Sequence, residues 1–581
     1  MFAALADLAH RRPRRVIALV VAVALVAGAL GGSVADRLGP YGAEDPATES
    51  VRADDLIARG GVQAGVDLVA LVPRDARVER LAAELRREPG VGRVVTYRQG
   101  GRDLVSKDGR STYLAVTFRR GVDDGDTAER LAGRYQGRPG VTLGGGALAE
   151  FQVNEQVSKD LSRAEMLAFP LLFVLSFLFF RSLVAALLPL MVGGLSIVLT
   201  FLGLRLASEV GEISVFALNL VTGLGLGLAI DYSLFIVSRY REELARSGPG
   251  LEALRRTLDT AGRTVLFSSL TVTAALASLL VFPQKFLYSM GLGGMMVSLI
   301  ASGVALIVLP AVLALLGPRV NSLAPRRLQH AADRDARPAK SGAWYRLSRA
   351  VMARPGRIAI ASAATLIALG LPFLGIKFTS VDPSVLPPSA SARQVDDALK
   401  SDFPPGRTQP IYVAAATRPG GRLTAYAREL QKLPGVDSVG RARPAGAGIA
   451  VLDVYSRANP LDERSQDLVR DVRDLRPSFE TAAGGQTAQF VDLKQSLVDH
   501  MPAALLIIVV ATFAVLFLMT GSLVLPLKAL VMNVLTLSAT FGILVLVFQD
   551  GRLEGLLDFE SAGGVEATQP VLLFAIAFGL A

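Results

Sequence analysis

The chain alternates between long apolar runs and two long polar regions. A helix needs about 20 mostly apolar residues to cross the hydrocarbon core of a bilayer. Runs that meet this requirement predict membrane spans at residues 16–32, 164–180, 183–206, 215–237, 264–283, 290–316, 357–376, 501–520 and 522–548. A further apolar run, 569–581, is too short to cross. The pattern therefore predicts an α-helical polytopic membrane protein.

The two polar regions, 33–163 and 377–499, follow the first and the seventh predicted span and have the patterns of α+β domains. In the first region, strand-like segments are 66–72, 91–97, 111–118 and 141–143, and helical segments are 76–87 and 126–135. In the second region, strand-like segments are 411–415, 436–441 and 449–455, and helical segments are 423–431 and 461–475. The order β-α-β-β-α-β predicts ferredoxin-like domains.

The second half of the chain resembles the first half. The matching segments are Arg12-Pro13-Arg14-Arg15 with Arg354-Pro355-Gly356-Arg357, Pro89-Gly90-Val91 with Pro434-Gly435-Val436, and Ser182-Leu183-Val184 with Ser522-Leu523-Val524. The offsets between the copies, 342, 345 and 340 residues, are nearly equal. We therefore predict a tandem repeat with pseudo-twofold symmetry, an arrangement known among transporters.

These patterns divide the chain into seven segments. They are an N-terminal transmembrane helix (1–32), a first extracytoplasmic α/β domain (33–163), transmembrane helices 2 to 6 (164–316), a cytoplasmic linker (317–356), transmembrane helix 7 (357–376), a second extracytoplasmic α/β domain (377–499), and transmembrane helices 8 and 9 with the short tenth run (500–581). The first span resembles a signal peptide, but it is longer than one and has an internal copy, so we interpret it as retained.

Composition and charge exclude several classes of protein. A hydrophobic fraction of 51%, a charged fraction of 19% and a mean hydropathy of +0.43 exclude a soluble enzyme and a disordered chain. The chain has no cysteine and only three, well separated histidines, so we expect no disulfide, no thiolate nucleophile, no metal site and no cofactor.

The distribution of basic residues predicts the orientation in the membrane. If the N-terminus is cytoplasmic, the segments predicted to lie inside carry 22 Lys and Arg against 7 Asp and Glu, in agreement with the positive-inside rule. One of them, 238–263, is predicted to form an amphipathic connector on the cytoplasmic surface. The sequence pI of 9.9 therefore reflects topology, and no nucleic-acid partner is predicted.

One acidic residue, Asp231, lies deep within a predicted span, between an apolar glycine-rich run and Tyr232. A charged side chain near mid-bilayer costs about 3 kcal/mol, so it needs a partner, a water path or a proton. A structural Asp that bonds to a neighbouring helix is the alternative interpretation. Since an intramembrane carboxylate marks an ion pathway by default, we predict that Asp231 carries a proton and that the Tyr232 hydroxyl donates to it or relays its proton.

Small and hydroxyl residues accompany this pair. Gly223, Gly225 and Gly227 have the spacing of a dinucleotide-binding loop, but they lie within an apolar span, so close helix packing is the better interpretation. In the next span, the candidates for support of the relay are Ser268, Ser269, Thr271 and Thr273. Their hydroxyl groups can bond to Asp231 across the bundle or, equally well, to their own helix.

The segment from Gly225 to Leu244, Gly-Leu-Gly-Leu-Ala-Ile-Asp-Tyr-Ser-Leu-Phe-Ile-Val-Ser-Arg-Tyr-Arg-Glu-Glu-Leu, resembles the MMPL family (mycobacterial membrane protein, large) of the resistance-nodulation-division superfamily. The resemblance covers the whole chain. It implies a twelve-span exporter of lipids, glycolipids or other hydrophobic molecules in the bacterial cytoplasmic (inner) membrane, driven by the proton-motive force and not an enzyme. It also implies a proton relay of two Asp-Tyr pairs, of which Asp231 and Tyr232 match the pair in the fourth span.

The resemblance leaves three functional hypotheses open. Gly579-Leu580-Ala581 aligns with Gly227-Leu228-Ala229, so the second Asp-Tyr pair would follow the last residue, and we expect a tenth span that is truncated. Proton antiport is the favoured hypothesis, with membrane lipid, a hydrophobic or glycolipid substrate and accessory membrane proteins as partners. The alternatives are a non-transporting scaffold or lipid sensor with the same fold, or an inactive fragment.

Overall fold

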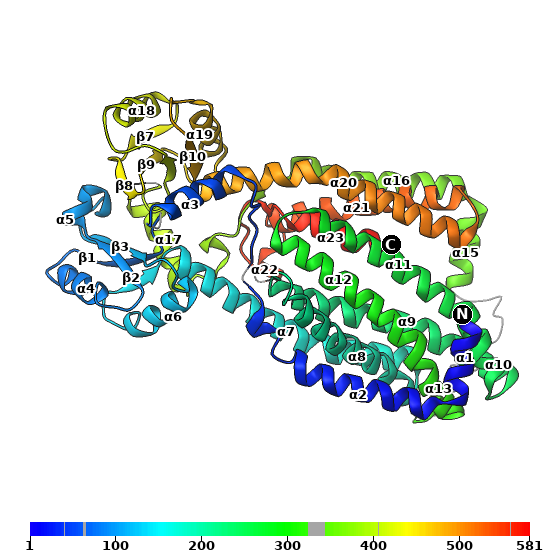
Figure 1. Cartoon of the computed structure of the whole chain (residues 1–581). Coiled ribbons are helices and arrows are strands. Elements are labelled where there is room, and N and C mark those ends of the chain that lie inside the picture. Colours follow the sequence, from blue (N-terminus) through cyan, green and yellow to red (C-terminus); the bar gives the residue numbers. More distant parts are fainter. Residues whose placement is uncertain (40, 62–64, 324–342, 405, 558, 581) are drawn as a thin grey trace.

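The computed structural model describes residues 1–39, 41–61, 65–323, 343–404, 406–557 and 559–580. The middle of the predicted cytoplasmic linker, 324–342, and the last residue of the short tenth run therefore lie outside the described residues. The described chain forms a bundle of long helices with a four-stranded and a five-stranded β-sheet at one end (Figure 1), and a third sheet pairs the short strands β5 (Phe378–Thr379) and β11 (Val565–Glu566). This arrangement agrees with a polytopic helical membrane protein.

Nine helices in the described residues are long and apolar enough to cross a membrane. They are α2 (Pro13–Gly31), α7 (Gly146–Phe180), α8 (Leu183–Ala207), α9 (Phe216–Ser247), the continuous helix of α10 and α11 (Leu251–Val281), α12 with its continuation through α13 (Lys285–Asn321), α16 with its last turn (Pro355–Gly375), α20 (Gln486–Thr520), and α21 with its last turn (Val524–Gln549). The short apolar run forms α23 (Gln569–Leu580). Each predicted span thus corresponds to one of these helices.

Two helices extend far beyond their predicted spans. Both α7 and α20 have 35 residues, and each begins directly after a glycine with positive φ, Gly145 or Gly485. Their first halves are polar, because they lie outside the apolar layer, and hydropathy therefore detected only the second halves. Each helix joins a sheet to the helix bundle without a break (Figure 1).

The first sheet has the strand order β2-β3-β1-β4, and all its neighbouring strands are antiparallel. The strands are β1 (Leu68–Pro73), β2 (Val91–Val95), β3 (Ser111–Phe118) and β4 (Thr142–Gly144), and the connecting helices are α4 (Arg77–Leu85) and α6 (Asp124–Tyr135). Alternate strand positions and one face of each helix form a single apolar core that includes Leu68, Leu114 and Leu131.

The second sheet has the order β10-β6-β9-β7, and β8 (Arg443–Gly446) pairs with β9. Its other elements are β6 (Ile411–Ala415), α18 (Gly421–Lys432), β7 (Val436–Val439), β9 (Ile449–Ser456), α19 (Glu463–Asp474) and β10 (Thr481–Gly484). The predicted elements of both polar regions are thus present, with ends shifted by up to a few residues.

Each of these two sheets is covered by a helix from the other half of the chain. Helix α3 (Glu49–Arg59) packs Ala53 and Ile57 against the second sheet, where they contact Tyr412 and its neighbours. Helix α17 (Ser391–Asp402) places Val395 against Val69 of the first sheet. The sequence patterns did not indicate these two helices or the exchange, because a short amphipathic helix carries no signal for the sheet on which it packs.

A buried carboxylate in the first sheet leads to a pH-dependent prediction. Burial raises the pKa of Asp67 to about 6, and the nearby Asp124 adds to this effect. The amide of Phe118, which donates to Asp67 at 2.6 Å, partly opposes it. The folded chain therefore favours the protonated form, and this contribution to stability is present at low pH and is lost as the pH rises through about 6. We expect Asp67→Asn to raise the apparent melting temperature at about pH 8, corresponding to about 1 kcal/mol after allowance for solvent screening.

The same variant measured at about pH 4 provides the internal control, because the wild-type carboxyl of the folded chain is then protonated and no buried charge opposes folding. Thermal unfolding in detergent, followed at both pH values, checks this expectation. An equal stabilisation at the two pH values would show that Asp67→Asn acts by some route other than proton binding.

Candidate functional site

The site lies on α9, which packs against α8 and α12. An apolar sequence without proline lets this helix run uninterrupted for 32 residues, from Phe216 to Ser247. Close packing is possible at Gly225, where an added Cβ would lie 2.8 Å from Val297 of α12 and 3.3 Å from Ile197 of α8. The site is therefore built on a helix that two neighbours hold tightly.

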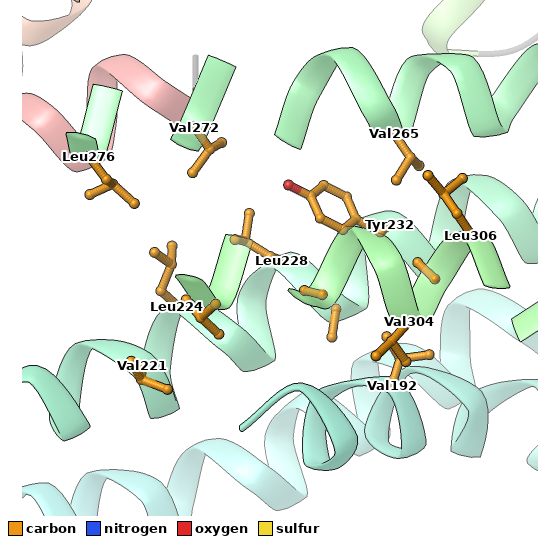
Figure 2. Packing of buried hydrophobic residues seen from close by; sticks show 14 of the residues in the cluster. Val192, Val221, Leu224, Leu228, Tyr232, Val265, Val272, Leu276, Val304 and Leu306 are labelled. Carbon is orange, nitrogen blue, oxygen red and sulfur yellow. The ribbon is translucent and has the colours of Figure 1, made fainter. Parts of the chain in front are cut away.

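The two predicted relay residues face opposite ways. Tyr232 is 2% exposed and belongs to the main apolar core of the bundle. Figure 2 shows its ring among Leu228, Val265 and Val304, with its hydroxyl on the side where α11 carries Val265 and Val272. Asp231, by contrast, lies exposed on the outer surface of the helix bundle. Within the described part of the chain its carboxylate has no hydrogen bond or ion pair to another side chain.

The Tyr232 hydroxyl is buried and has no hydrogen-bond partner among the described residues. The hydroxyl-bearing side chains of Ser268 and Ser298 lie beside it, but neither makes a hydrogen bond of ordinary geometry to it. A buried hydroxyl without a partner lowers the stability of the fold by about 1 to 3 kcal/mol, so such a group in an apolar core indicates a role other than packing. A phenol that can both donate and accept is suited to passing a proton between groups that approach it.

The hydroxyl residues of α11 that form hydrogen bonds do so within their own helix. Ser269 donates to the carbonyl of Leu266 at 2.9 Å and Thr271 to that of Phe267 at 3.0 Å, so both bond to their own helix. Ser298 of α12 donates to the Ser269 carbonyl at 3.1 Å and ties the two helices together. Ser268 is exposed, on the side of α11 that is open in the described chain. None of the predicted support residues bonds to Asp231 in this arrangement.

The three glycines also differ in their surroundings. Only Gly225 is packed against neighbouring helices; a Cβ at Gly223 or at Gly227 would meet nothing within 4 Å. These two residues and Asp231 follow one another at intervals of four, so they lie on one face of α9. All three are exposed. The face therefore presents a strip without side chains that leads along the helix to the carboxylate.

Helix α23 packs against α11. An added Cβ at Gly579 would lie 3.0 Å from Cβ of Ala275 and 3.1 Å from Cα of Val272. Because Val272 belongs to the same apolar cluster as Tyr232, α23 reaches the level of the site. The short tenth run is thus part of the scaffold around Tyr232.

Two further polar clusters were not predicted from the sequence. At the other end of α9, the carboxylate of Glu243 is 1% exposed and lies 2.7 Å from Arg239 and 3.6 Å from Arg246. Periodicity placed Glu243 on a solvated connector, whereas α9 continues past it and buries it. Arg256 of α10 (Leu251–Thr257) also lies 3.9 Å from Glu243, so the cluster of charges joins α9 to α10.

The second cluster joins the residue directly before α12 to α20. Ser496 of α20 donates to Asp45 at 2.6 Å and accepts a hydrogen bond from Gln284 at 2.9 Å. Gln284 is fully buried and directly precedes α12. The two partners of Ser496 are 212 and 451 residues away in sequence, and no local pattern could indicate them. Through this cluster, the helix that packs on the site is linked to the helix that carries the second sheet.

The fold and this site define a multi-pass membrane protein with a carboxylate on a membrane-spanning helix. The chain belongs to the MMPL family: the family model matches residues 66–358 and 446–566. The resemblance carried by the segment from Gly225 to Leu244 is thereby confirmed.

Individual relatives agree with this assignment. The chain is 38% identical to the membrane protein SCO6666 of Streptomyces coelicolor, with 100% of this chain and 82% of the relative covered. It is 31% identical to the trehalose monomycolate exporter MmpL3 of Mycolicibacterium smegmatis, with coverage of 82% and 51%. It is 30% identical to the mycolic acid-containing lipids exporter MmpL11 of the same species, with coverage of 75% and 47%. The chain spans about half the length of these two exporters.

Proposed function

We propose that the protein exports a lipid, a glycolipid or another hydrophobic molecule across the bacterial cytoplasmic membrane in exchange for protons, and that it is not an enzyme. The observation that carries the proposal is Asp231, an exposed carboxylate on a helix whose composition suits a bilayer. Relatives named as exporters of trehalose monomycolate and of mycolic acid-containing lipids support the substrate class.

In this proposal Asp231 binds a proton from one side of the membrane and releases it to the other. A neutral carboxyl is compatible with an apolar environment, whereas a carboxylate needs water or a cation, so protonation changes which surroundings the helix tolerates. Tyr232, whose buried hydroxyl has no partner, passes the proton on, and Ser268, Ser269 and Thr271 orient α11 beside it. Transport follows if this change alters the packing of α9 against α8 and α12.

We further propose that the two sheets form ferredoxin-like, porter-type domains within a tandem repeat. The strand order β2-β3-β1-β4, reached through a β-α-β-β-α-β succession, supports the first part. Two observations support the repeat: α7 and α20 have equal lengths, and each ends at a residue with positive φ, Arg181 or Gly521. Both sheets lie at one end of the bundle (Figure 1), as a parallel repeat requires.

The proposed orientation places the N-terminus in the cytoplasm and both sheets outside. Cysteines introduced at the exposed positions Asp126 and Asp462 of this cysteine-free chain should both react with an impermeant thiol reagent on intact cells. A cysteine at Asp259, on the other side in this topology, is the control and should react only after permeabilisation. Protection of one of the two outer positions would contradict the parallel orientation.

Proton-driven lipid movement is tested with the purified chain in liposomes. We expect fluorescent phosphatidylethanolamine or a fluorescent glucosyl lipid to move between leaflets when a pH gradient is imposed, and the movement to stop when a protonophore removes the gradient. Movement that is independent of the gradient would contradict proton antiport. Lipid binding without gradient-dependent movement would instead favour the lipid sensor.

A further inference from the structure

A cavity of about 230 Å³ opens in the second sheet domain, between α18, the end of α19, β10 and the exchanged helix α3. Pockets for drug-sized molecules measure about 300 to 1,000 Å³. This cavity is smaller, so it has room for one small ring and not for an acyl chain. It lies outside the apolar layer, in a domain that the proposed transport mechanism has not yet used.

Part of the cavity wall is aromatic. Tyr426 of α18 and Phe479, in the loop before β10, meet edge to face, with ring centroids 5.7 Å apart and an interplanar angle of 85°. Tyr426 is only 6% exposed, and its buried hydroxyl makes no hydrogen bond of ordinary geometry in the described chain, although the Thr481 side chain of the cavity wall lies beside it. A buried hydroxyl that the protein leaves without a partner at a cavity wall is available to a ligand.

The rest of the wall is polar, with both signs of charge. Arg473 binds Asp492 at 2.6 Å, and its Nε lies 3.5 Å from a Glu49 oxygen, an ion pair without a hydrogen bond among the described residues. Arg476 and Glu480 stand at the rim and are exposed. Cations and carboxylates therefore nearly balance around the cavity, which disfavours an anion such as phosphate.

The corresponding surface of the first sheet domain lacks these groups. Under the offsets of the repeat, Leu81 stands in place of Tyr426, and Pro139 and Gly140 stand in place of Phe479 and Glu480. Leu81 instead packs into the apolar core of its own domain. The cavity is thus a property of the second half and not of the fold.

From this juxtaposition we propose that the cavity binds a neutral sugar ring, the pyranose of a glycolipid headgroup. An aromatic face covers the apolar C–H face of such a ring, and paired charged groups supply donors and acceptors for its hydroxyls. The Tyr426 hydroxyl gains the partner that the protein does not provide. This inference rests on the proposed export of lipids and specifies the polar part of the substrate.

The test is binding of methyl α-D-glucopyranoside to the whole chain in phospholipid nanodiscs, measured by saturation-transfer NMR in the absence of sugar-based detergent. We expect specific saturation transfer to the sugar, weakened about five- to tenfold in affinity by Tyr426→Phe, which removes one hydroxyl. Tyr288→Phe, on α12, makes the same chemical change elsewhere and should leave binding unchanged. Because the Tyr426 hydroxyl has no protein partner, the melting temperature should stay the same.

A second variant, Phe479→Leu, removes the aromatic wall and should weaken binding by at least as much. Equal binding by the wild type and both cavity variants would overturn the proposal, and so would displacement of the sugar by inorganic phosphate, which would identify an anion site. These outcomes are independent of transport. Proton-driven lipid movement without sugar binding would refute this inference alone, and sugar binding without such movement would refute the proposed function alone.

Discussion

Replacing Asp231 by asparagine is expected to abolish proton-driven lipid movement while the amount of folded protein in the membrane stays the same. Asparagine has nearly the shape of aspartate but cannot bind or release a proton in the physiological range. One proton that crosses a potential of about 100 mV releases about 2.3 kcal/mol, and a chain that cannot carry it loses that driving force. The expected loss is therefore complete and not partial.

The exposed position of Asp231 makes this variant easy to interpret. Its carboxylate has no bond to another side chain in the described chain, so Asp231→Asn breaks no structural contact there. The matched control is Asp259→Asn, which makes the same change at an exposed residue in the short helical segment that precedes α11. Both variants are compared with the wild type in the liposome assay and by thermal unfolding. Normal gradient-dependent movement by Asp231→Asn would leave Asp231 without a role in coupling.

The sequence predicted well those elements whose apolar pattern is bounded at both ends by polar or turn-forming residues. Residues 183–206 were predicted as a span and form α8, and residues 111–118 were predicted as a strand and form β3 with the same bounds. In both cases the run is bounded by polar or turn-forming residues, so the period and the limits are local information. The predicted spans of α7 and α20 captured only their apolar halves, because the outer halves face water.

The arrangement around the site depends on information that is not local. The sequence singled out Asp231 and Tyr232, but it did not indicate that Asp231 is exposed whereas Tyr232 is buried, with 2% of its surface exposed. Which face of a wholly apolar helix meets a neighbour depends on the shapes of both helices. The same limit applies to Ser50, whose amide donates to Asp492, 442 residues later, where α3 docks on the second half.

These non-local contacts link the site to the second sheet. α9 packs against α12 at Gly225, Gln284 directly before α12 bonds to Ser496, and α20 connects Ser496 to the second sheet. A shift of α12 that follows a change of proton occupancy at Asp231 would therefore reach the domain that holds the proposed sugar site. The structure supplies the contacts for such coupling, and a double-mutant cycle between the two sites measures its free energy.

The second large effect is expected at the contact between α16 and α21, which lie side by side (Figure 1). No residue of α16 (Pro355–Gly370) is buried, so this helix is held mainly where it comes closest to its neighbour. At that point an added Cβ on Gly542 would lie 1.8 Å from the carbonyl oxygen of Leu369 and 2.9 Å from Cα of Gly370. The glycine therefore allows direct contact between two backbones, as small residues do in membrane helix pairs.

We expect Gly542→Ala to separate these helices and to lower the apparent melting temperature in detergent by several degrees. Alanine favours a helix over glycine by about 1 kcal/mol, but overpacking costs about 1 to 3 kcal/mol and the obstructing atoms here belong to the backbone, which no rotamer change can move away. The clash should therefore dominate, and Gly542→Val should destabilise further.

The matched control is Gly194→Ala on α8, where an added Cβ would meet nothing within 4 Å. There only the gain in helix propensity remains, so stability should stay the same or rise slightly. The fraction of monodisperse protein that survives heating, measured for all three variants and the wild type, checks these expectations. If Gly542→Ala were as stable as Gly194→Ala, α16 would be held by contacts other than its close approach to α21.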